Sequence, residues 1–166
     1  MQNSGTMQAI IMFDHANGFY LCAELCEKAF DSKTLRWDLY STPSSVNLAF
    51  ACEIYLKTLL FCIDNEKPIK QHRLNDLIAL LPEDVKDSIM QSVYMKFPLE
   101  KNAWGESYLN LVSDTFTEWR YSYEKYQLSC EIGYLRALAD SLKEECAHRI
   151  FGISWDEYIG INIDSR

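Results

Sequence analysis

One stretch of the chain, residues 42–64 with the sequence TPSSVNLAFACEIYLKTLLFCID, is apolar on almost every side when drawn as a helix. Its main polar interruptions are Asn47, Glu53, Lys57 and Thr58. A helix that is hydrophobic nearly all round belongs in the middle of a helical bundle. Thr42 suits an N-cap and Pro43 the first helical position, so we expect a long, mostly buried helix from Thr42 to Asp64.

The charged residues of this stretch argue against a membrane span. Glu53 and Lys57 would lie near the centre of a bilayer, where a lysine alone costs about 2.5 kcal/mol or more. The two residues are one helical turn apart, in the favourable order of glutamate before lysine. A polar stripe on a central helix is where we first look for a function.

Length and composition restrict the class of protein. The chain has 166 residues, 48% of them hydrophobic, and a formal charge of −8. These values predict a single folded domain over residues 1–166 and argue against broad binding of a phosphate backbone, although a small basic pocket remains compatible with them. Residues 1–7 are polar and carry no cationic segment of a signal peptide, so we expect a cytoplasmic protein.

The six cysteines do not form a recognisable metal or redox motif. No CxxC pair occurs, which argues against a zinc ribbon or a thioredoxin-type site. The cysteines all fall in apolar helical patterns, and we expect them to behave as small core residues: Cys22, Cys26, Cys52, Cys62, Cys130 and Cys146. No cofactor or metal is expected.

The first helix is expected over Met7–Phe30. One stripe on it has spacings of three and four residues and is predicted to pack against the second helix; it comprises Ile11, His15, Gly18, Cys22, Leu25 and Ala29. His15, Cys22 and Cys26 share a helical face, so a metal site is the alternative interpretation. Because the stripe is otherwise apolar, we favour the core interpretation over the metal site.

Helical patterns continue to the C-terminal end. They predict helices over His72–Leu81, Glu83–Lys96, Gly105–Tyr126 and Leu128–Ile150, with Gly152 ending the last. The tail, residues 153–166, carries Trp155, Tyr158, Ile159 and Ile161 and is expected to pack on the body. Strand signals are nearly absent, so the predicted fold is all-α, a bundle of four long helices with short additional helices.

Two further segments carry candidate binding residues. The segment Lys70–Arg73, with the sequence KQHR, is the most basic part of the chain; it is either a solvated helix start or an anion or nucleotide contact through His72. The predicted helix Gly105–Tyr126 is rich in aromatic residues and carries Arg120, for which Glu124 and Glu53 are candidate partners.

The order of these segments resembles the HEPN superfamily. The resemblance covers roughly Phe19 to Leu142 and rests on SVNLAFACEIYLKTLL, then HRLNDLIALLP, then FTEWRYSYEKY. It implies a helical bundle, often dimeric, in a family of metal-independent ribonucleases and of toxin, defence and nucleotide-binding modules. The candidate ligand-binding residues are Glu53, Lys57, His72, Arg120, Tyr123 and Glu124.

The ribonucleases of that family resemble one another in an arginine and a later histidine separated by four to six intervening residues. After Arg120 the matching positions are Lys125, Tyr126 and Gln127, so the motif is not present. We therefore expect a non-catalytic module acting as a homodimer, with a nucleotide or RNA as ligand or a partner protein from the same operon. The alternative is an atypical ribonuclease in which His72 moves the proton and Arg120 holds the phosphate.

Overall fold

The computed structural model describes residues 4–28, 38–64, 69–97, 105–119 and 130–163, and within these ranges the chain is all-α. The helices are α1 (Ser4–Lys28), α2 (Asp38–Asp64), α3 (Leu74–Ala79), α4 (Glu83–Lys96), α5 (Gly105–Ser113), α6 (Thr115–Trp119), α7 (Ile132–Phe151) and α8 (Trp155–Ile163).

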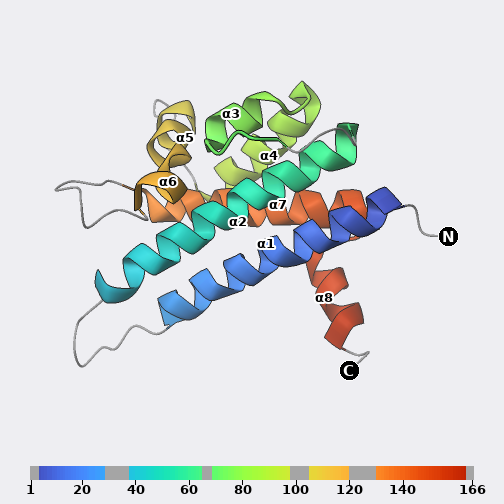
Figure 1. The fold of residues 1–166 in the computed structure, drawn as a ribbon, viewed down its shortest axis with the longest axis horizontal. Coiled ribbons are helices and arrows are strands. Elements are labelled where there is room, and N and C mark those ends of the chain that lie inside the picture. Colours follow the sequence, from blue (N-terminus) through green and yellow to red (C-terminus); the bar gives the residue numbers. More distant parts are fainter. Residues whose placement is uncertain (1–3, 29–37, 65–68, 98–104, 120–129, 164–166) are drawn as a thin grey trace.

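The three long helices form the body of the bundle. In Figure 1, α1 and α2 run side by side and α7 lies behind them, while α3, α4, α5 and α6 cover one side and α8 extends from the other. Along α2, apolar side chains are buried on almost every side, as the sequence predicts: Leu48, Ala49, Ala51, Cys52, Tyr55, Leu56, Leu59 and Leu60. Its neighbours α1, α6 and α7 together cover these faces.

The predicted start of the second helix is wrong. The helix begins at Asp38, so Thr42 is not a cap and Pro43 lies inside the helix. A proline there lacks the amide hydrogen that would complete one helical hydrogen bond. The Asn47 side chain donates to the Pro43 carbonyl oxygen at 2.8 Å. Packing of α2 against α1 offsets the lost hydrogen bond. This packing is a tertiary contact, so the local capping pattern does not predict it.

The predicted packing stripe of the first helix is also wrong. Ile11, His15, Gly18, Cys22 and Leu25 face outward and are exposed. The face turned toward α2 and α7 is the opposite one, with Ala9, Phe13, Ala16, Tyr20 and Ala23 buried. The core interpretation of Cys22 and His15 therefore fails, and no group of metal-ligating residues occurs within the described ranges.

The predicted helix over Gly105–Tyr126 is interrupted at Asp114. Its backbone oxygen accepts from the amides of Thr117 and Glu118, at 3.0 and 2.9 Å, so Asp114 starts the new helix α6. Its side chain accepts from Arg73 Nε at 2.9 Å. A long-range ion pair thus helps to fix a break that the apolar pattern alone would cross.

Other predicted boundaries agree more closely. The helix predicted over Glu83–Lys96 is α4, with the same ends. Gly152 ends α7 in the left-handed conformation at φ 72°, and its amide donates to the His148 oxygen at 2.8 Å. The tail packs on the body as predicted, since the Trp155 and Tyr158 rings contact Phe13, and it does so as the helix α8.

One helix meets the length and composition criteria for a membrane span. Within the described residues, the segment Tyr40–Asp64 of α2 meets these criteria. Of its most apolar 18-residue stretch, 56% is buried inside the bundle. A core helix covered by other helices meets the same criteria, and α2 also holds a buried carboxylate at Glu53.

Two buried thiols and a buried phenol predict a loss of stability at alkaline pH. Burial raises the pKa of Cys52 and Cys146 above the ordinary 9.0, and that of Tyr55 above 10.0. Their contribution is fully present below about pH 9 and is lost as the pH rises toward the folded-state pKa values. Lys143 acts in the opposite direction, because burial lowers its pKa from 10.5. Burial also raises the pKa of Tyr20 and Tyr134, so the groups that lose stability outnumber Lys143, and we expect the melting temperature to fall between about pH 9 and 11.

Thermal unfolding measured across that range by circular dichroism tests this expectation. Cys52→Ala should make the fall less steep than in the parent protein. Cys22→Ser, at an exposed site, should leave it unchanged. A melting temperature that is constant up to about pH 11 would contradict the argument.

Candidate functional site

A buried carboxylate in the middle of α2 organises the candidate site. Glu53 is almost wholly buried, and its Oε1 accepts hydrogen bonds from Lys57 Nζ and from His72 Nδ1, each at 2.9 Å. The second oxygen, Oε2, is also buried and has no hydrogen-bond partner within the described part of the chain. One oxygen atom therefore joins a residue of its own helix to a residue nineteen positions away.

The segment that carries His72 is held by its neighbours. Arg73 pairs with Asp114, and the Asn75 amide donates to Ser113 Oγ at 3.1 Å. Leu74, between them, is buried in the core. These contacts attach the start of α3 to the end of α5, and they place His72 over α2. The helix begins at Leu74, two residues later than predicted, because Arg73 has an extended backbone.

The Glu53 contact determines the hydrogen-bonding state of the imidazole. An ionised carboxylate only accepts hydrogen bonds, so the proton of the neutral ring is on Nδ1. Nε2 is then left with its lone pair, and it has no partner among the described residues. The His72 side chain is 56% exposed, whereas that of Glu53 is 3% exposed. A buried carboxylate thus holds a surface imidazole in one orientation, as carboxylates do for catalytic and ligand-binding histidines.

Three of the six predicted site residues lie together around the Glu53 carboxylate. The structure brings Glu53, Lys57 and His72 together. Arg120, Tyr123 and Glu124 lie outside the described residues. The helix α6, which precedes them in the sequence, packs on α2, where the Phe116 and Phe50 rings stack with their centroids 4.4 Å apart.

A groove opens next to the start of α3. It has a volume of about 530 Å³ and lies between α3, α4 and α5. Asn75, three residues after His72, lines it, as do Asn110 and the apolar side chains of Ile78 and Leu109. The side-chain nitrogen of Asn75, Nδ2, donates to the side-chain oxygen of Asn110 at 3.0 Å. Asp76, Lys86 and Asp87 also line the groove, so it combines apolar walls with amide and charged groups, as sites for small organic ligands do.

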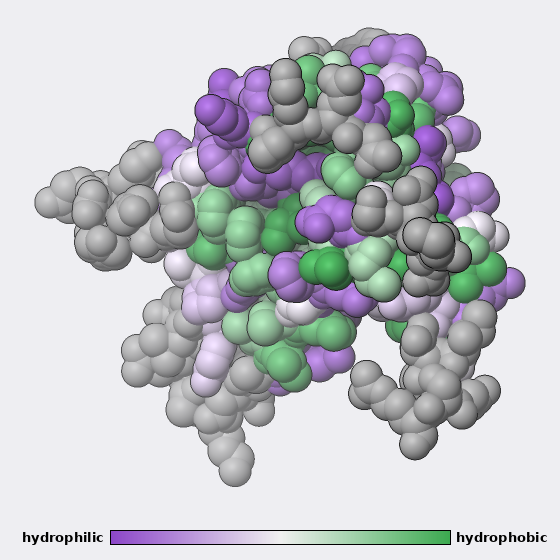
Figure 2. All heavy atoms as spheres, turned by 45° about the vertical axis from the view of Figure 1, so that its right-hand side comes forward, coloured by the Kyte–Doolittle hydropathy of each residue, from purple (hydrophilic) through white to green (hydrophobic). Residues whose placement is uncertain are grey.

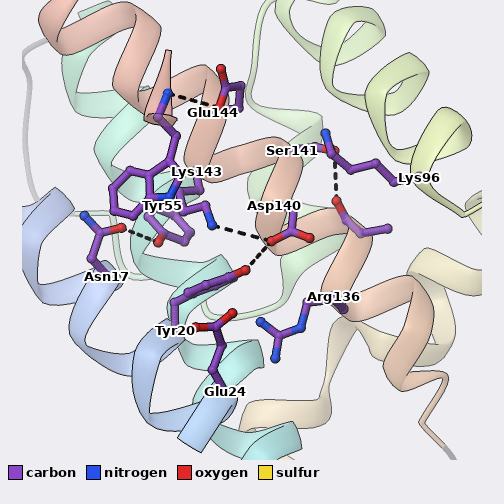
Figure 3. Close-up of polar contacts among 12 residues, drawn as sticks. Asn17, Tyr20, Glu24, Tyr55, Lys96, Arg136, Asp140, Ser141, Lys143 and Glu144 are labelled. Carbon is purple, nitrogen blue, oxygen red and sulfur yellow. Dashed lines mark hydrogen bonds and ion pairs between the residues drawn. The ribbon is translucent and has the colours of Figure 1, made fainter. Parts of the chain in front are cut away.

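A second polar cluster, which the sequence analysis missed, joins α1 to α7. In Figure 3, Tyr20 on α1 points toward Asp140 on α7, and its hydroxyl donates to Oδ1 at 2.5 Å. Lys143 Nζ is 3.6 Å from the same carboxylate oxygen. The ammonium also lies 3.7 Å from the centroid of the Tyr20 ring and 4.9 Å from that of Trp155. We call Tyr20, Glu27, Arg136, Asp140 and Lys143 the α7 network.

The other half of the α7 network reaches α2. Arg136 donates to Glu27 Oε1 at 2.6 Å, and Ser44 Oγ donates to the same oxygen at 3.0 Å. Burial lowers the pKa of Arg136, but the hydrogen bond and charge of Glu27 outweigh it and raise the pKa overall. Burial also lowers the pKa of Lys143, against the opposing effect of Asp140. These contacts tie three helices together and identify the α7 network as structural.

A sequence signal for the α7 network did exist. Arg136, Asp140 and Lys143 are spaced by four and three residues, which puts three charges on one helical face. The apolar side chains of the same helix, such as Leu135 and Leu142, indicate the other face as the buried one. Three charges on a helix usually mean a solvated face, and their burial here depends on Tyr20 and Glu27 of α1.

Known proteins offer no further guide to this arrangement. Comparison of the chain with protein-family models, curated proteins and solved structures finds no match. Any functional assignment must therefore come from the residues of the site and from the motif resemblance.

Proposed function

We propose that this chain is a HEPN-like helical module that binds the phosphate of a nucleotide or RNA without catalysing a reaction on it. We further propose that it acts as a cytoplasmic homodimer, in nucleotide-linked regulation or in a bacterial toxin–antitoxin or defence system with a partner protein from the same operon. The support for this family is the order of the three sequence motifs and the all-α bundle.

The single observation that carries the proposal is the contact between Glu53 and His72. The buried carboxylate orients the imidazole, while Lys57 contributes an ammonium to the same place. Lys70 and Arg73 lie on the exposed segment beside His72, and Arg73 also pairs with Asp114. Phosphate oxygens accept hydrogen bonds from lysine and arginine, and from His72 when its imidazolium form carries a proton on the outward Nε2 as well as on Nδ1.

The neighbouring groove supplies a place for the rest of the ligand. Asn75 Oδ1 already accepts from Ser113 and Asn110 Oδ1 from Asn75, so the groups that can pair with the edge of a base are the remaining N–H donors of the two side chains, near Ile78 and Leu109. A ligand with its phosphate at His72 and its base in the groove would therefore find both kinds of contact on one side of the bundle.

Ligand binding by the full chain tests the proposal. Inorganic phosphate, adenosine monophosphate and a short single-stranded RNA are titrated by calorimetry against the parent protein and against His72→Ala. We expect at least one phosphate-bearing ligand to bind, and its dissociation constant to rise by about tenfold in the variant, about 1.4 kcal/mol. His148→Ala, at an exposed histidine of α7, should bind like the parent. Equal binding by all three proteins, or none, would reject the site.

A second candidate function, an atypical metal-independent ribonuclease, is favoured by the oriented imidazole alone. Its free nitrogen, Nε2, is placed as in a general base whose partner is a carboxylate. Glu53→Gln separates the two functions. The glutamine keeps an oxygen that can accept from His72 Nδ1, so the imidazole stays oriented and binding should be largely kept, whereas a general base at His72 would lose the negative charge that stabilises its protonated form, and with it its activity. Cleavage of a labelled RNA by the parent, lost in Glu53→Gln, would select the ribonuclease.

A further inference from the structure

The outward face of α1 is apolar along most of its length. Four large side chains on it are exposed: Met7 by 46%, Ile11 by 42%, Leu21 by 49% and Leu25 by 66%. Gly18, also exposed, lies among them. This face is opposite the one that packs in the core, so α1 has two apolar sides and the described helices cover one. Figure 2 shows that hydrophobic side chains also reach the surface of the molecule, among hydrophilic ones.

The spacing of these side chains points to what covers them. From Met7 to Ile11, Leu21 and Leu25 the steps are four, ten and four residues, so the pattern is the same read in either direction along the helix. A twofold dimer brings identical surfaces together, and residue i of one copy then meets residue j of the other while j meets i. A helix with such a pattern matches itself when the second copy runs antiparallel.

We propose that α1 binds α1 of a second copy of this chain, antiparallel, through these four side chains. Met7 then lies against Leu25 of the second copy, and Ile11 lies against Leu21. This inference rests on the homodimer of the proposed function and names its interface.

The centre of the face is compatible with a close approach. In this register Asp14 faces Gly18 of the second copy. A side chain added at Gly18 would meet no heavy atom within 4 Å, so the space above that residue is open for the neighbouring helix. The Asp14 carboxylate accepts a hydrogen bond from the Tyr158 hydroxyl at 3.3 Å, which holds it toward α8.

The size of the contact predicts a weak dimer. The four side chains extend over about 27 Å of helix at about 1.5 Å per residue, and a helix is about 10–12 Å wide, so one helix face covers roughly 300 Å². A standard interface buries about 800 Å² per partner. We therefore expect a dimer with a dissociation constant in the range of tens to hundreds of micromolar, about 10–500 μM.

The charge of the chain predicts how salt affects this dimer. Each copy carries a formal charge of −8, so two copies repel one another, and added salt screens that repulsion. The apolar contact itself does not weaken with salt. Association should therefore become tighter between about 0.05 and 0.5 M salt. A basic partner on the same face would show the opposite dependence.

Sedimentation velocity of the full chain over about 5–500 μM tests the interface. The parent protein should shift toward dimer with concentration, and Leu25→Asp should weaken dimerisation by at least about tenfold. Met95→Asp, at the equally exposed end of α4, is the matched control and should behave like the parent. A dimer that survives Leu25→Asp unchanged would overturn this interface and leave the proposed homodimer intact. A parent protein that is monomeric throughout would overturn both, while phosphate binding at His72 would still be measured separately.

A cross-link tests the register. The test uses the double substitution Asp14→Cys and Gly18→Cys in a background with Cys22→Ser and Cys26→Ser. Mild oxidation should form intermolecular disulfides, because the thiol at position 14 of one copy faces the thiol at position 18 of the other. The Asp14→Cys substitution alone should form far fewer. Equal cross-linking by the two proteins would contradict the antiparallel register.

Discussion

Replacing Phe13 by alanine is expected to destabilise the fold by about 3–5 kcal/mol, one of the two largest effects that we predict for single substitutions in this chain. The Phe13 side chain is fully buried. Its ring lies 5.9 Å from that of Tyr55, 5.8 Å from that of Phe151, 5.8 Å from that of Trp155 and 5.7 Å from that of Tyr158. Alanine would leave a cavity where α1, α2, α7 and α8 meet.

Urea unfolding followed by circular dichroism measures this loss as a lower midpoint with an unchanged slope. Leu21→Ala, on the exposed face of the same helix, is the control and should cost less than about 1 kcal/mol at a protein concentration low enough to keep the chain monomeric. A Phe13→Ala protein as stable as that control would show that the aromatic cluster does not hold α8 to the bundle.

Replacing Asp140 by alanine is expected to cost about 1–3 kcal/mol, because it removes the carboxylate of a partly buried charge pair and leaves the buried Lys143 without it. Lys143, which is buried, would lose its nearest carboxylate, and the Tyr20 hydroxyl would lose its acceptor. The remaining carboxylate that acts on Lys143 through its charge is Glu24. Removal of one partner costs more than the pair contributes, since the other is left desolvated without compensation.

A companion substitution separates charge from hydrogen bonding. Asp140→Asn keeps an acceptor for Tyr20 but removes the charge opposite Lys143, so its cost should be intermediate. Asp87→Ala, at an exposed aspartate of α4, should change the free energy of unfolding by less than about 0.5 kcal/mol. If Asp140→Ala unfolds at the same urea concentration as Asp87→Ala, the α7 network does not stabilise the protein.

Two predictions were wrong because the apolar pattern of a helix does not show which neighbours it meets: the packing face of α1 and the unbroken helix through Asp114. The two apolar faces of α1 have the same helical spacing, so the sequence does not distinguish the stripe with Ile11 and Leu25 from the stripe with Phe13 and Tyr20. The larger aromatic side chains face the core, where their area is removed from water. The break at Asp114 is similar: the apolar pattern continues through it, and a salt bridge to Arg73 contributes to the turn.

The sequence by itself determined that the chain is helical, that α2 is its central helix and that Gly152 ends α7, because periodicity and capping are local properties of neighbouring residues. It also singled out Glu53, Lys57 and His72 as polar residues of interest. Only the tertiary structure decided that one buried oxygen of Glu53 joins the other two, and that the charges of α7 turn inward toward Tyr20 and Glu27. Such contacts link residues far apart in the chain, and the free energy of placing a charge depends on the groups that other helices bring to it.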